Sequence, residues 1–224
     1  MTRQELEIYE CSIVAAASNH NPTILNPDFL KRNGIIPEEW EAKKVLCTEV
    51  ISQVVFGNGL GITIEPKRII FLENDPERST LPRLDEISVR YVQTLPHAAY
   101  TAVGINFKAV VAFKHLEEAK AWLLENLVSS GPWKSIDGGL KGASLTLVYE
   151  IQAAKLTLKL DPAEVQRAGE PSPRPVVLFD GNFHRELPKD NHSLVIPRME
   201  AIMNAWTKDR RSFSKVVEKI LPQR

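Results

Sequence analysis

The chain has 224 residues, of which 43% are hydrophobic and 25% are charged, and this ordinary globular mixture excludes a disordered chain and a disulfide scaffold. Lys plus Arg and Asp plus Glu number 28 each, so no strong net field draws the protein onto nucleic acid or an anionic membrane. A chain of this length can bury a substantial core in one large domain or two small ones.

The first half begins with a strand over residues 6–17, which ends in small apolar residues as a strand covered on both faces does. A polar turn around His20 follows. Asn26 and Pro27 then have the residue types that cap and open a short helix, and Asn33-Gly34 would end it.

Three strands and a helix are expected to complete this half. The strands are one over residues 45–56 and two more joined at Pro66, with Gly57-Asn58-Gly59 as a hairpin turn. The helix is expected to begin at Ser79 or Thr80 with Pro82, and to end at Pro96. Its apolar residues at helical spacing are Leu84, Ile87, Tyr91 and Leu95.

The second half repeats this order of elements. A strand over 100–113 precedes a helix over 116–127, and strands follow over 140–151, 154–160 and 176–183. The last helix is the longest, with apolar residues from Val195 to Ile220 and a bend expected near residues 208–211. The glycine-containing segment Asp137-Gly138-Gly139 is interpreted as a turn, and Asp180-Gly181-Asn182 as a turn or bulge at the end of a strand.

A weak internal repeat supports a duplication. The segment 60–69 aligns with 156–165, so that Glu65-Pro66 corresponds to Asp161-Pro162, and the same register aligns Ile13-Val14-Ala15 with Ala109-Val110-Val111. We therefore predict an α+β fold, an antiparallel sheet with helices packed on one face, built from two pseudo-repeats of β-α-β-β-β-α. The repeats would span residues 1–96 and 97–224 within one compact pseudo-twofold domain.

Two resemblances accompany this layout. The element order resembles the saddle of TATA-binding protein, although a shared layout does not carry function. Three patches resemble a sporadically distributed family of uncharacterised bacterial proteins, a resemblance that implies no activity and no site residues. These patches are Ile64 to Phe71, Tyr100 with Gly104-Ile105-Asn106-Phe107, and Val177-Leu178-Phe179-Asp180 ahead of the long helix that bears Phe213.

Motifs for catalysis are missing from the sequence. It contains no Gly-x-Ser-x-Gly elbow and no His-Glu-x-x-His pair, and neither Cys11 nor Cys47 lies beside a histidine. We expect no metal and no cofactor, and we favour a non-enzymatic protein over an enzyme, with both cysteines as buried reduced thiols. Because no apolar run reaches the length of a membrane span, we also expect a cytoplasmic protein that does not enter the membrane.

Three functional hypotheses remain at this point. The first is a non-enzymatic binding or scaffolding protein, a homo-oligomer that holds a protein partner on its sheet or on a helix face such as the one carrying Met199, Met203 and Trp206. The second is a small-molecule receptor or enzyme with a pocket between the halves. Its pocket would be bordered by Ser18, Asn19, His20 and their counterparts near His115. The third is nucleic-acid binding on the sheet face, which the balanced charge disfavours.

Overall fold

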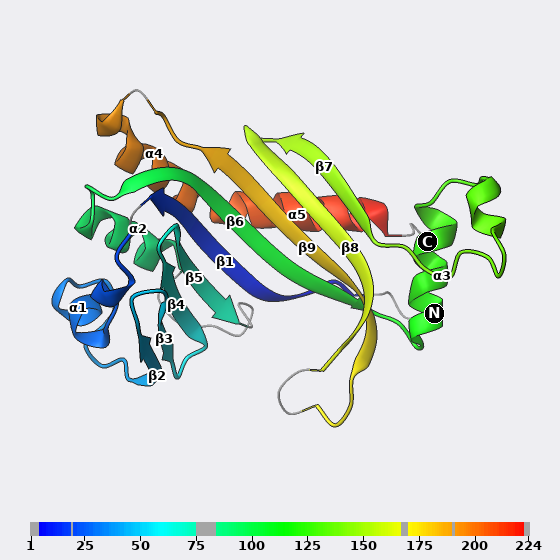
Figure 1. Ribbon diagram of the computed structural model, residues 1–224, viewed down its shortest axis with the longest axis horizontal. Coiled ribbons are helices and arrows are strands. Elements are labelled where there is room, and N and C mark those ends of the chain that lie inside the picture. The colour runs from blue at the N-terminus through cyan, green and yellow to red at the C-terminus, as the bar shows by residue number, and fades with distance from the viewer. Residues whose placement is uncertain (1–4, 19, 75–83, 167–169, 190, 222–224) are drawn as a thin grey trace.

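The computed structural model describes residues 5–18, 20–74, 84–166, 170–189 and 191–221. Nine strands of this part of the chain form one antiparallel sheet in the order β2-β3-β4-β5-β1-β6-β9-β8-β7 (Figure 1). The strands are β1 (Glu7–Ser18), β2 (Ala42–Cys47), β3 (Ser52–Phe56), β4 (Leu60–Glu65), β5 (Arg68–Asn74), β6 (Ala99–Ala112), β7 (Leu145–Ile151), β8 (Ala154–Val165) and β9 (Arg174–Glu186).

The helices pack on one face of this sheet, as predicted for the α+β fold. They are α1 (Pro27–Arg32), α2 (Leu84–Thr94), α3 (Leu116–Asn126), α4 (Val195–Asn204) and α5 (Trp206–Ile220), with short 3-10 turns at η1 (Pro22–Ile24), η2 (Pro132–Ser135) and η3 (His192–Leu194). In Figure 1, α5 passes behind β9 and β8, so the strands in the middle of the view are seen from their uncovered side. Alternate side chains of each strand point toward the helices and form the core.

The two halves meet at the centre of the sheet, where β1 pairs with β6 in antiparallel orientation. Outward from this pair, the first half places β5, β4, β3 and β2 in order, and the second half places β9, β8 and β7. The second half thus has the expected sequence of elements, with its last helix divided into α4 and α5. The first half has one strand more than predicted.

The additional strand arises from a turn that the sequence does not mark. The predicted strand over 45–56 is wrong, because the chain reverses between β2 and β3. The Thr48 hydroxyl donates to the Ile51 carbonyl at 2.6 Å and accepts from the Ile51 amide at 3.0 Å, and the Thr48 amide donates to the Ser52 hydroxyl at 3.2 Å. Side-chain hydrogen bonds hold this turn without the glycine, proline or asparagine that usually identifies one.

The proposed correspondence between Pro66 and Pro162 is also wrong. Pro66 lies in the turn between β4 and β5, whereas Pro162 lies inside β8, opposite Val177 of β9. The pairing of β7 with β8 ends at Leu160, so beyond that residue β8 pairs with no described strand on its β7 side. A proline is tolerated there because its missing N–H interrupts no ladder.

A glycine in the middle of β9 lets the last helix approach the sheet closely. The prediction of a turn or bulge at Asp180-Gly181-Asn182 is wrong, since β9 continues through these residues and its register with β6 and β8 is unbroken. A Cβ atom on Gly181 would lie 2.7 Å from the ring of Phe213, and that ring stacks on Phe107 with centroids 5.5 Å apart. The break between α4 and α5 falls at Ala205, a little before the bend expected near residues 208–211.

Local signals were more accurate at α1. The Asn26 side chain accepts from the Phe29 amide at 2.8 Å, and the chain leaves the helix through Gly34 at a φ of 63°, both as predicted. The strand expected from residue 140 begins only at Leu145. The expected start of α2 at Ser79, Thr80 and Pro82 lies outside the described residues.

Candidate functional site: the open face of the sheet

One face of the sheet has no described helix on it, and we call it the open face. Residues that pair directly across an antiparallel sheet share a face, so the strand registers identify the side chains that line it. The row across its middle, from β3 to β7, consists of Val55, Gly61, Leu72, Ser12, Asn106, Asn182, Thr157 and Val148. This row is apolar in the first half of the molecule and polar at the centre.

The centre of the open face is a chain of hydrogen-bonded side chains on three neighbouring strands. The side-chain amide of Asn106 donates to the Ser12 hydroxyl at 3.0 Å. The side-chain amide of Asn182 in turn donates to Oδ1 of Asn106. A Cβ atom on Gly104 would lie 3.1 Å from the Asn182 nitrogen, so glycine leaves room for that amide. An asparagine amide has two donor hydrogens and an acceptor oxygen, so this ladder retains capacity for an external partner.

A second row of the open face carries charges of alternating sign. Glu10, Lys108, Asp180 and Lys159 lie opposite one another on β1, β6, β9 and β8. Lys108 and Glu10 form an ion pair at 2.8 Å. Burial raises the pKa of Asp180 above its ordinary value, although the positive charges of Lys108 and Lys159 oppose this shift. Two acids and two lysines make this row neutral as a whole.

On the first-half side, the open face is apolar. Val14 lies opposite Ile70, and both are partly exposed, as are Leu72 and Val55 in the neighbouring row. Gln53 and Thr63 form a hydrogen bond of 3.1 Å beyond them. The open face therefore joins a partly exposed apolar area to a hydrogen-bonding centre and a charge-balanced row.

The structure does not bring together the residues predicted to border a pocket between the halves. Ser18 is exposed at the end of β1, and Asn19 lies outside the described residues. His115 is exposed at the start of α3, just after β6. Because β1 and β6 run antiparallel, the segments that follow them lie at opposite ends of the central pair, about 40 Å apart at the usual rise per strand residue.

His20 is a buried residue of the helix-covered side and not a candidate base at a cleft. Its Nε2 atom lies 2.7 Å from the Tyr91 hydroxyl, and the two rings are in edge contact. Burial lowers the pKa of His20 and raises that of Tyr91. Both groups therefore stay neutral near pH 7 and act as a hydrogen-bonded pair within the core.

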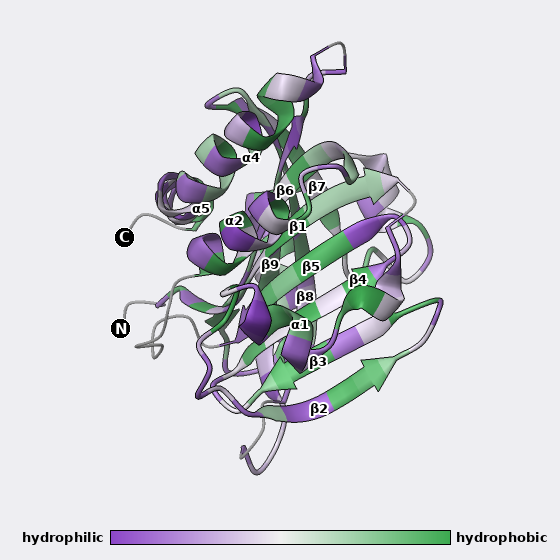
Figure 2. Cartoon of the chain, turned by 90° about the vertical axis from the view of Figure 1, so that its left-hand side faces the viewer, coloured by the Kyte–Doolittle hydropathy of each residue, from purple (hydrophilic) through white to green (hydrophobic). Residues whose placement is uncertain are grey.

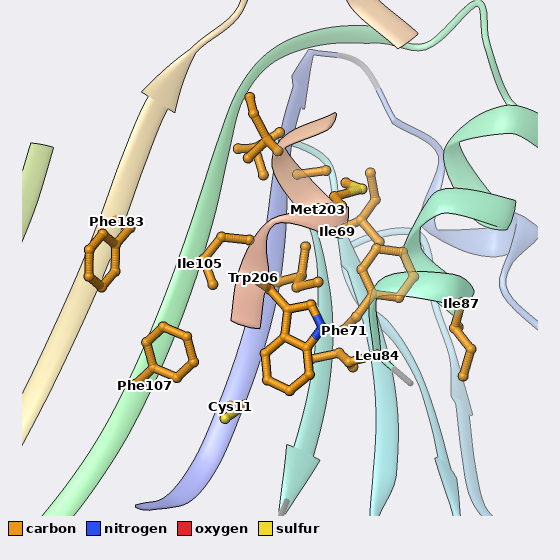
Figure 3. Close-up of a cluster of buried hydrophobic side chains, with 14 of the residues drawn as sticks. Cys11, Ile69, Phe71, Leu84, Ile87, Ile105, Phe107, Phe183, Met203 and Trp206 are labelled. Carbon is orange, nitrogen blue, oxygen red and sulfur yellow. The ribbon is translucent and has the colours of Figure 1, made fainter. Parts of the chain in front are cut away.

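The predicted partner-binding face of the last helix is also wrong. Met199 and Met203 are fully buried, and Trp206 is 7% exposed. Figure 3 shows Met203 and Trp206 among core side chains that include Ile69 and Phe71 of β5. Because these residues face the sheet, they hold α4 and the start of α5 on it and cannot contact a partner of the folded chain.

A buried ion pair joins β9 to α5 on the covered face. Arg185 donates two hydrogen bonds of 2.7 Å to the Asp209 carboxylate, and Asp209 has no exposed surface. No three His, Cys, Asp or Glu side chains gather to hold a metal ion in the described part of the chain. Cys11 is buried, as expected, but Cys47 is exposed on the edge strand β2.

Asn182 was predicted to lie in a turn or bulge, and neither Ser12 nor Asn106 was predicted to be functional, although a signal for the polar ladder exists. Asparagine is depleted in strands, yet Asn106 lies between two apolar residues of β6, and Asn182 lies within β9. A polar amide at such a position indicates either a bulge or a side chain with a partner on a neighbouring strand. Only the register shows which strands carry the partners.

No protein-family model matches the chain, and no curated protein is similar enough to it to be a relative. None of the helices in the described residues is sufficiently long and apolar to cross a membrane.

Proposed function

We propose that this chain is a non-enzymatic binding protein that holds a protein partner on the open face of its sheet. The observation that carries the proposal is the composition of that face. It presents partly exposed apolar side chains beside the Ser12–Asn106–Asn182 ladder, and charged residues lie to one side. Protein interfaces contain apolar area, hydrogen-bonding groups and charged residues, and the open face offers all three.

The charges of the open face favour a protein over a nucleic acid. A surface that binds a phosphate backbone carries an excess of lysine and arginine, because affinity comes from neutralising phosphates. Here Lys108 is engaged by Glu10, and Asp180 is flanked by Lys108 and Lys159. A partner complementary to this row must carry both positive and negative groups, spaced like neighbouring strands of the sheet. Protein surfaces carry charges of both signs, whereas a phosphate backbone carries only negative charges.

A photo-cross-linking residue at Thr157, in the central row, tests the proposal in the cells that make the protein. Glu218, which is exposed on α5, provides the matched control position. We expect position 157 to cross-link to one defined protein and position 218 to give no such product. Cross-linking to the same protein from both positions, or from neither, would contradict the proposal.

The partner identified in this way allows a quantitative test. Thr157→Arg places a bulky charge in the centre of the open face and should weaken binding by about tenfold or more, the effect of disturbing a central interface residue. Glu218→Arg should leave the affinity unchanged. A short DNA or RNA duplex should show no binding even at low ionic strength, and binding that falls steeply with added salt would favour the nucleic-acid alternative.

A further inference from the structure

The two edges of the sheet differ in their protection against pairing with another strand. The edge strand β2 carries Lys43 and Lys44, and its register with β3 shifts between Ala42 and Lys44. Figure 2 shows this part of β2 as hydrophilic. Lysines and an irregular register are features by which edge strands avoid pairing with other chains.

The opposite edge strand, β7, has none of these features. It contains no lysine, arginine or proline, and its register with β8 is regular from Leu145 to Ile151. Val148 is 55% exposed, and the alternate residues Leu145, Leu147, Tyr149 and Ile151 are only partly buried. In Figure 1, β7 is the outermost strand on this side of the sheet.

The turn after β7 determines which of its backbone groups point outward. Gln152 and Ala153 both have positive φ, 51° and 56°, as in a type I′ two-residue hairpin. Such a turn makes Ile151 and Ala154 a hydrogen-bonded pair, so the odd-numbered residues of β7 bond to β8. The N–H and C=O groups of Thr146, Val148 and Glu150 therefore point away from the sheet.

We propose that β7 pairs in antiparallel orientation with β7 of a second copy of this chain, with Val148 opposite Val148. In this register the outward groups of Val148 bond to each other across a twofold axis, and those of Thr146 bond to Glu150 of the second copy. The partly exposed apolar residues match as well, with Leu147 opposite Tyr149 and Leu145 opposite Ile151. The pairing uses every residue of the strand.

Two observations favour a second copy over an unrelated strand, and a third shows that this edge of the sheet has room for one. In antiparallel self-pairing, the partly buried apolar side chains of β7 lie beside the same side chains of the second copy, on the same face of the joined sheet. Each set therefore shields the other from water. The one charged residue, Glu150, then faces the hydroxyl of Thr146, and no like charges oppose each other. In the first half of the molecule four strands lie outward of β1, and the outermost is β2. In the second half three described strands lie outward of β6, so the position that would correspond to β2 is open beyond β7.

The twofold axis of this dimer is perpendicular to the sheet, so the helices of both copies lie on one side and both open faces on the other. The two nine-stranded sheets become continuous. A partner of the open face would then meet a surface of twice the width. The pairing itself does not depend on such a partner.

Sedimentation of the full chain over a range of concentrations, with and without Val148→Pro, tests the proposal. Because the Val148 N–H points outward, proline at this position removes no hydrogen bond from the β7–β8 ladder but blocks the pairing with a second copy. We expect the wild-type chain to form dimers and the variant to remain monomeric. Val45→Pro, on the opposite edge, should leave the dimer intact.

A cysteine variant gives an answer even if the proline variant does not fold. In a Cys47→Ser background, Val148→Cys should form a disulfide-linked dimer under mild oxidation, because the two positions adjoin on the twofold axis. A wild-type chain that stays monomeric at all concentrations would overturn the proposal. So would a Val148→Pro dimer, or a wild-type dimer linked through the native Cys47 of β2.

Discussion

The two faces of the sheet are made by alternate residues of the same strands, yet they differ in composition and in role. On β6, Phe107 is fully buried against the helices, whereas its neighbour Asn106 lies on the open face in a hydrogen-bonded ladder. The covered face holds the aromatic and aliphatic core and the buried pair of Arg185 and Asp209. Stability thus depends mainly on the covered face, and the open face is the one for which we propose a protein partner.

The largest expected effect comes from breaking the buried ion pair. Asp209→Ala leaves the Arg185 guanidinium without its partner in an environment with little access to water. We expect this change to lower the free energy of unfolding by about 3–5 kcal/mol, the usual cost of an unpaired buried charge. Urea denaturation followed by circular dichroism measures it.

The double variant Arg185→Met/Asp209→Leu is the control for this experiment. It removes both charges and should recover most of the lost stability, because apolar residues of similar size replace buried ion pairs at little cost. A double variant as unstable as Asp209→Ala would show that the loss comes from packing and not from the unpaired charge.

Gly181→Ala is expected to have the next largest effect. Its Cβ atom would lie 2.7 Å from the Phe213 ring, so α5 must move away from β9. Overpacking of this kind costs about 1–3 kcal/mol. The midpoint of thermal unfolding should fall accordingly. The double variant Gly181→Ala/Phe213→Leu should lose less stability than the sum of the losses of the two single variants.

The buried histidine predicts a dependence of stability on pH. Burial lowers the pKa of His20 in the folded chain below the ordinary value of 6.5, so between these two values the unfolded chain binds a proton that the folded chain does not. The contribution of neutral His20 to the free energy of unfolding is complete above pH 6.5. It is lost as the pH falls from 6.5 to the lower pKa of the folded chain. We expect a smaller effect here than for the ion pair.

Denaturation midpoints measured between pH 8 and pH 5 test this prediction. The double variant His20→Phe/Tyr91→Phe removes both members of the hydrogen-bonded pair and should flatten the dependence. Tyr91→Phe alone keeps the histidine and should keep the dependence. If the denaturation midpoint of the double variant changed with pH as steeply as that of the wild type, the pH dependence would come from groups other than His20.

The smallest effect is expected on the open face. Thr157→Ala removes a partly exposed hydroxyl on the face that no described helix covers, so the free energy of unfolding should change by no more than about 0.5 kcal/mol. A loss comparable to that of Gly181→Ala would mean that the open face contributes to stability as the covered face does. The division of roles between the faces would then be wrong.

Much of the architecture could be predicted from the sequence because it depends on local periodicity. Alternating apolar residues indicated the strands around β1, β6 and β9, and the cap at Asn26 indicated α1. The helices on one face of an antiparallel sheet followed from the order of these elements. Side-chain periods of two and 3.6 residues are properties of the chain itself, so they need no knowledge of its neighbours.

Other features were decided only by tertiary structure, because they depend on which strands pair and in which direction. The antiparallel pairing of β1 and β6 separates His20 from His115, and the packing of α4 on the sheet buries Met203. The register across β1, β6 and β9 aligns Asn106 with Asn182. Strand direction and register are set by contacts between residues far apart in the chain, and no local pattern encodes them.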